Sequence, residues 1–155
     1  MAFQVHALPV EPFAPLFALP DAALDAHHAR RVTVEQAGYA PCRVSLSYAD
    51  AGETVLLVNH LHLDVANPYR SRHAVYVREG AQPGVFGVNE LPETLRRSFL
   101  SVRWFDATHD MIDADLVDGD GLAAALDAGF AKPQVEYAHL HYAKRGCYAA
   151  RVTRA

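Results

Sequence analysis

The chain has few of the features that mark secreted, membrane or metal-ribbon proteins. It contains only two cysteines, Cys42 and Cys147, and they do not form a Cys-x-x-Cys pair. This scarcity argues against a zinc ribbon and against a disulfide-stabilised secreted domain. No apolar run is long enough to span a bilayer, and the N-terminal residues Met-Ala-Phe-Gln-Val-His lack the basic segment and apolar stretch of a signal peptide. We therefore expect a cytoplasmic protein that does not contact a membrane.

An excess of basic residues is also missing. The formal net charge is -4 and the sequence pI is about 6.1, so a broad nucleic-acid-binding surface is not expected. Hydrophobic residues make up 51% of the chain and charged residues 21%, which is the composition of a globular protein. At 155 residues we expect one domain over residues 1–155, with the proline-rich residues 1–20 as an arm on its surface.

The pattern of apolar residues predicts many short strands and few helices. Alternation of apolar and polar side chains predicts strands at residues 3–8, 31–36, 42–48, 54–62, 73–78, 100–106 and 111–117, followed by a hairpin within 137–152. Helices are expected at residues 21–28 with Asp21 as the cap, after Pro92, and after Asp120 as the cap. The fold class is therefore α+β: a bent, mostly antiparallel sheet or partial barrel of about seven strands with three short helices.

The last hairpin holds the densest group of reactive side chains. Gly146 suits its turn, and the period of two places His139 and His141 on the same face of the first strand. A second His-x-His pair, His60 and His62, lies in the most apolar strand. Each pair could supply two ligands to a metal ion. Neither has a suitably spaced carboxylate, and position 143 holds alanine where a third alternating histidine would stand, so we predict no metal and no cofactor.

Two other chemistries fit the same hairpin. Cys147 could act as a nucleophile if His139 or His141 and a nearby arginine favoured its thiolate, although a buried structural cysteine is the commoner case. The second is anion binding by arginine, because guanidinium groups bind carboxylate or phosphate through two hydrogen bonds. Its candidate groups are Arg43, Arg70, Arg103, His139 and His141. The alternative is that these arginines form structural ion pairs with Asp106, Asp113 and Asp115.

Several segments together resemble a bacterial family called domain of unknown function 1203. These segments are PCRVSL at 41–46, PYR at 68–70, LSVR at 100–103, VDG at 117–119, His139, and Ala-x-x-Gly-Cys-Tyr at 143–148. The resemblance spans nearly the whole chain and implies a stand-alone domain, without an activity to carry over. This chain departs from the family pattern at Tyr142, where asparagine is expected, and at His141, where some relatives carry arginine. Arginine does not ligate metals, which weakens the metal hypothesis further.

The leading hypothesis is therefore a domain that binds a small anionic or polar molecule on a sheet face. Its predicted ligand-binding residues are Arg70, Arg103, His139, His141 and Cys147. One alternative is a small enzyme that uses His139 and His141 with Cys147 or a metal. Another is a homodimeric interaction module. No residue is assigned a catalytic role.

Overall fold

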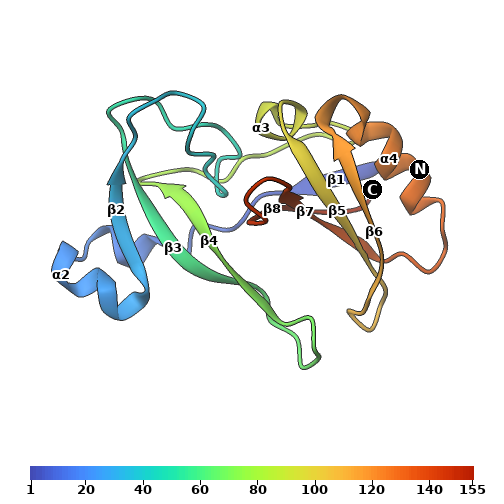
Figure 1. The fold of residues 1–155 in the computed structure, drawn as a ribbon, viewed down its shortest axis with the longest axis horizontal. Helices are drawn as coiled ribbons and strands as arrows, with labels where there is room; N and C mark the ends of the chain where they lie inside the picture. The colour runs from blue at the N-terminus through green and yellow to red at the C-terminus, as the bar shows by residue number, and fades with distance from the viewer.

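The computed structural model describes residues 1–155 as two antiparallel sheets lying side by side (Figure 1). The larger sheet has the order β1 (Phe3–His6), β8 (Tyr148–Arg154), β7 (Tyr137–Tyr142), β5 (Phe99–Phe105), β6 (Met111–Asp118). The smaller sheet has the order β2 (Ala29–Thr33), β3 (Thr54–Leu63), β4 (Ser71–Arg78). The predicted α+β class with mostly antiparallel strands is confirmed, and its eight strands are divided between two open sheets.

The helices are short. They are α1 (Ala14–Phe17), α2 (Asp21–Leu24), α3 (Glu93–Arg96) and α4 (Leu122–Phe130), with 3-10 turns η1 (Asp25–His27) and η2 (Gly119–Gly121). None of them is long and apolar enough to cross a membrane. The predicted helix caps are wrong: Asp21 is the first residue of α2, and Asp120 lies inside η2, where its backbone N–H bonds to the Asp118 side chain. The proline-rich arm is also more regular than expected, since α1 forms within it.

Helix α4 covers one face of the five-stranded sheet (Figure 1). Its buried residues Leu122, Leu126 and Phe130 pack on alternate sheet residues such as Val102 and Leu140. Burial of this apolar surface is the main stabilising contribution expected here. The period of two that directs these side chains toward α4 directs their neighbours to the opposite face of the sheet.

A second core lies on the three-stranded sheet. Phe13 and Leu16, from the proline-rich arm, are buried with Leu56 and Val58 of β3 and Val75 of β4. The arm is therefore attached through apolar side chains. Strand β3 is central in its sheet, which agrees with its being the most apolar strand in the sequence.

The predicted strand at 42–48 is wrong. The segment is a loop whose only ladder contacts are single bridges from Pro41 to Tyr48 and from Cys42 to Tyr76. Leu46 has a φ of 51°, outside the β region, and its N–H bonds to the carbonyl of Cys42. The alternating apolar residues are still buried, because the loop lies between the two sheets' cores rather than at a surface.

Candidate functional site

A row of basic side chains crosses the face of the larger sheet that α4 leaves uncovered. His139 of β7 is directly opposite Arg103 of β5 on one side and Arg151 of β8 on the other. Arg151 is in turn opposite His6 of β1. Directly opposed residues in antiparallel strands project from the same face, so four basic side chains from four strands stand in line. We call this set, His6, Arg151, His139 and Arg103, the basic row.

The smaller sheet brings two more histidines to this face. His62 of β3 and His73 of β4 have ring centroids 4.8 Å apart, and the His62 ring lies 5.5 Å from that of His139 and 5.2 Å from that of His141. A β-bulge between Leu61 and Leu63 leaves His62 without a direct partner on β4. Bulges are frequent beside functional sites, where they re-aim side chains. We call His62, His73, His139 and His141 the histidine cluster.

Hydrogen bonds within the cluster are incomplete. The Nε2 atom of His62 lies 2.7 Å from the Nδ1 atom of His73, and the Nδ1 atom of His141 lies 2.9 Å from the carbonyl oxygen of Gly146. Because a carbonyl only accepts, the Nδ1 of His141 carries a proton and its Nε2 carries a lone pair. The Nδ1 atoms of His62 and His139 are buried and have no hydrogen-bond partner. Such buried unpaired polar atoms are uncommon in proteins.

The cluster is uncharged at neutral pH. Burial, reinforced by the neighbouring histidines, lowers the pKa of His62 to about 2. Burial also lowers the pKa of His139 and of His141 to about 3; the positive charges of Arg103 and Arg151 add to this effect at His139. Neutral imidazoles can accept hydrogen bonds or coordinate a cation, which protonated ones cannot.

Tyr148 and Arg43 hold the closing hairpin against the cluster. The Tyr148 ring stacks on His62 with a centroid distance of 4.6 Å and an interplanar angle of 18°. Arg43 is 1% exposed; its Nε donates to the Tyr148 carbonyl at 2.8 Å, and its other nitrogens donate to the Pro41 carbonyl and to the Cys147 sulfur. The PCRVSL segment therefore places a buried guanidinium under the hairpin. It donates hydrogen bonds to two carbonyl oxygens and one sulfur and forms no salt bridge with a carboxylate.

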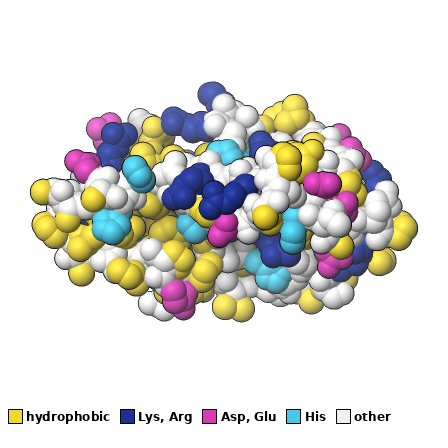
Figure 2. All heavy atoms as spheres, turned by 90° about the horizontal axis from the view of Figure 1, so that it is seen from below, with side chains coloured by type: hydrophobic (Ala, Val, Ile, Leu, Met, Phe, Trp, Pro, Cys, Tyr) yellow, Lys and Arg dark blue, Asp and Glu magenta, His cyan; other side chains and the backbone are white.

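Three members of the basic row, His6, His139 and Arg151, and one further histidine of the cluster, His62, line a pocket of about 380 Å³; Arg103 lies outside its lining. Its polar lining consists of His6, His62, Asp64, His109, His139 and Arg151. Figure 2 shows Lys and Arg side chains gathered at the middle of one face of the molecule, with histidines beside them. The volume is within the range of small-molecule sites, and the polar lining combines one arginine, one carboxylate and four imidazoles.

The structure brings together part of the residue set predicted from the sequence. His139 and His141 lie in the cluster, and Arg103 stands beside His139. Arg70 is exposed and pairs with Asp64 at the pocket rim. The Cys147 thiol contacts Arg43, and no hydrogen bond joins it to a histidine. None of Asp106, Asp113 and Asp115 forms a salt bridge with these arginines. Asp113 pairs with Lys132 instead.

Four contributors lie outside the ligand-binding set predicted from the sequence, namely His62 as a partner of His139, His73, Arg151 and Tyr148. The available signal was the presence of two His-x-His pairs, His60 with His62 and His139 with His141. Taken separately, neither pair has a third metal ligand among its flanking residues. Combining one member of the first pair with both members of the second requires knowing that β3 and β7 face each other.

The fold and the site define a two-sheet α+β protein with a histidine cluster between its sheets. The chain belongs to the family described as "Protein of unknown function (DUF1203)", whose model matches residues 39–154. The matched range includes the whole histidine cluster, together with Arg103 and Arg151 of the basic row; His6 lies outside it. Searches of curated proteins and of solved structures found no match.

Proposed function

We propose that the protein binds a small anionic molecule, a carboxylate or phosphate compound, in the pocket beside the basic row. One observation carries this proposal: Arg103 and Arg151 flank His139, and neither forms a salt bridge with a carboxylate. The whole chain is acidic, with a net charge of -4, so this uncompensated positive charge is local. Low-dielectric walls strengthen the attraction of such a charge for an anion.

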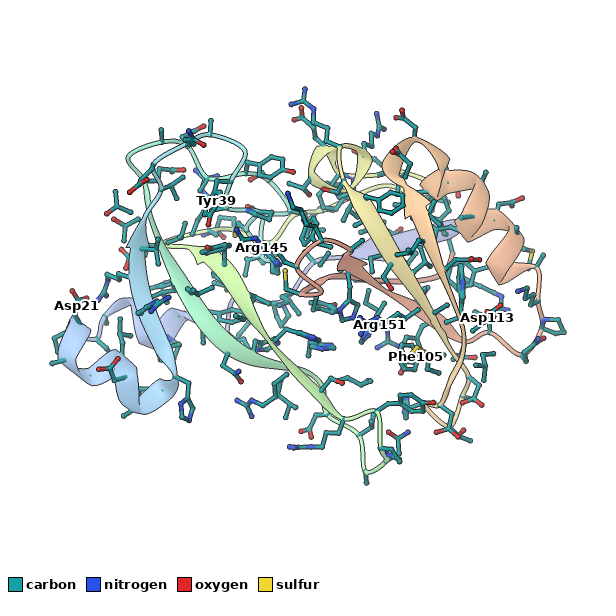
Figure 3. The ribbon with its side chains drawn as sticks, in the orientation of Figure 1. Asp21, Tyr39, Phe105, Asp113, Arg145 and Arg151 are labelled. Carbon is teal, nitrogen blue, oxygen red and sulfur yellow. The ribbon has the colours of Figure 1, made fainter.

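Arg151 is the principal anchor in this proposal. Its guanidinium carbon lies 4.3 Å from the centroid of the Tyr137 ring, and it lines the pocket. Stacking on an aromatic ring orients the guanidinium plane without using its N–H groups, which remain available for bidentate contacts. Figure 3 shows Arg151 on the side of the larger sheet that faces the smaller one.

Arg103 stands on the far side of His139, outside the pocket lining, and in this proposal its side chain extends to the same ligand. Neighbouring strands are about 4.8 Å apart, so the backbones at Arg103 and Arg151 are separated by roughly 10 Å. Two arginine side chains can span that distance onto one dicarboxylate or phosphate ester. Arg103 makes only one weak side-chain contact, 3.4 Å to Ser101, and burial lowers its pKa, both of which fit a guanidinium held for a partner.

A thermal-shift screen of inorganic phosphate and small mono-, di- and tricarboxylic acids tests this proposal. At least one anion is expected to raise the melting temperature of the wild-type protein, and the Arg151→Met variant is expected to lose most of that shift. Arg97→Met is the matched control, because Arg97 is an exposed arginine paired with Glu93 on α3. The proposal fails if no anion stabilises the wild type, or if Arg151→Met and Arg97→Met respond alike.

A further inference from the structure

The histidine cluster has the arrangement of a metal-binding site. One ring nitrogen from each of His62, His139 and His141 lies within 4.8 Å of the other two. Nitrogen ligands bind zinc at about 2.0–2.1 Å, so two of them on one tetrahedral ion are roughly 3.4 Å apart. The ring nitrogens therefore need to approach one another by up to about 1.4 Å for all three to bind one ion. No bonded network among the three rings opposes this movement.

The free nitrogen atoms are those that a metal ion would use. The buried Nδ1 atoms of His62 and His139 lack hydrogen-bond partners, and His141 keeps a lone pair on Nε2 because its Nδ1 donates to Gly146. The second nitrogen of His62 contacts His73. Metal-binding histidines characteristically have their other ring nitrogen held by a carbonyl or another polar group. His141 and His62 both show this pattern.

We propose that His62, His139 and His141 bind one divalent transition-metal ion, with His73 orienting His62 and with an open coordination position toward the pocket. Three imidazoles without a carboxylate suit zinc, cobalt, nickel, iron or copper, and do not suit magnesium or calcium, which require oxygen ligands. His62 and His139 line the pocket, so the ion would be reached from it. The sequence analysis predicted no metal because neither His-x-His pair has a third ligand nearby; the third histidine comes from the other sheet.

The nearby arginines favour a negatively charged fourth ligand. Arg103 and Arg151 flank His139, and their positive charge opposes binding of a dication. An anion bound to the metal through the open position would offset both the ion and the arginines. This part of the inference rests on the proposed function: the anion held by Arg151 would also be the exogenous ligand of the ion. The metal site itself rests only on the three histidines.

Cobalt titration of the chelator-treated full-length protein tests the site. Co²⁺ held by three imidazoles in a four- or five-coordinate site gives visible absorption bands that are much more intense than those of hexahydrated Co²⁺. The expected result is an absorption increase that saturates at one ion per chain and is abolished by one equivalent of Zn²⁺. His62→Ala and His139→Gln should each abolish the bands, whereas His60→Ala should retain them. His60 is the matched control, because it lies two residues from His62 on the same strand, its ring packs against Phe13, and it is not one of the three histidines whose ring nitrogens converge.

Far-ultraviolet circular dichroism of each variant confirms that it is folded. His62 is only half-buried, so His62→Ala provides a variant that tests the site even if His139→Gln does not fold. Bands that fail to appear in the wild type, or that persist unchanged in folded His62→Ala, overturn the metal site. Repeating the titration with phosphate or a dicarboxylate separates the two proposals: Co²⁺ bands without any anion effect support the metal alone, and anion stabilisation of metal-free protein without bands supports the anion site alone.

Discussion

The Nε2 atom of His62 lies 2.7 Å from the Nδ1 atom of His73, so one ring donates a hydrogen bond to the other across the β3–β4 pair. When the proton is on His62, the Nδ1 of His62 carries a lone pair, and that atom is the buried one without a partner. With His73 as the acceptor, this hydrogen bond holds His62 in the tautomer that can bind a metal ion. The residue acts through His62, without itself belonging to the group of three.

Replacing His73 provides a direct test of this relationship. His73→Phe keeps an aromatic ring beside His62 but removes the acceptor nitrogen, and loss of such an outer contact typically weakens metal affinity about 10- to 100-fold. The Co²⁺ bands should therefore keep their shape while the midpoint of the titration moves to higher concentration. His73→Gln, whose amide oxygen can accept the same proton, should recover part of the affinity. An unchanged midpoint for His73→Phe would show that His73 has no positioning role.

Arg43 is expected to be essential for stability. It is buried, and its guanidinium satisfies the carbonyls of Pro41 and Tyr148 and the sulfur of Cys147. Arg43→Met leaves the buried carbonyls without donors, at a cost of about 1–3 kcal/mol for each. Urea denaturation should show a clearly lower free energy of unfolding for this variant. Arg97→Met, at an exposed arginine, should change it by no more than about 0.5 kcal/mol.

Gly129 permits the close contact between α4 and the larger sheet. A Cβ atom at position 129 would lie 2.1 Å from the Trp104 ring, and Trp104 is buried and in edge-to-face contact with Phe130. Gly129→Ala must therefore displace α4 or the indole, and overpacking of this kind typically costs about 1–3 kcal/mol. Gly121→Ala, at the residue that precedes α4, is the matched control, because the atom nearest to its added Cβ would be 3.6 Å away. Equal melting temperatures for the two variants would contradict this account.

Buried tyrosines should make the protein less stable at alkaline pH. Burial raises the pKa of Tyr142 to about 12 and raises that of Tyr148 still further. The unfolded chain loses its phenolic protons above about pH 10, whereas the folded chain retains these two. Their contribution is therefore constant below pH 10 and is lost as the pH rises toward 12. Urea midpoints measured across this range should decline.

The alkaline decline can be assigned to particular residues by substitution. Tyr142→Phe removes one of the tyrosines with a raised pKa, so its urea midpoint should fall less steeply with pH than that of the wild type. Tyr69→Phe removes a half-buried tyrosine outside this group and should leave the slope unchanged. Tyrosinate absorbance provides a second measurement, because the late-ionising fraction should decrease in Tyr142→Phe alone. Identical slopes in all three proteins would argue against a role for tyrosine burial.

Local patterns predicted local structure well in this chain. The alternation in β3, β5 and β7 identified these strands, and the same alternation placed His139 and His141 on one face. It failed at residues 42–48, where a strand-like pattern forms a loop, because burial between two cores also requires alternating apolar side chains. The helix caps failed for a related reason. An N-cap residue is defined by its own non-helical backbone angles, which the amino-acid type alone does not specify.

By itself, the sequence determined the α+β class, the central position of β3, the paired histidines of the last hairpin and the resemblance to the family. Each depends on residues close together in the chain or on a pattern distributed along it. Only the tertiary structure decided that His62 meets His139 and His141, that Arg151 stands opposite His139, and that Cys147 lies against Arg43. Those contacts depend on strand register and on which sheet faces meet. They result from packing over the whole molecule, since β3 and β7 are far apart in sequence and do not share a sheet.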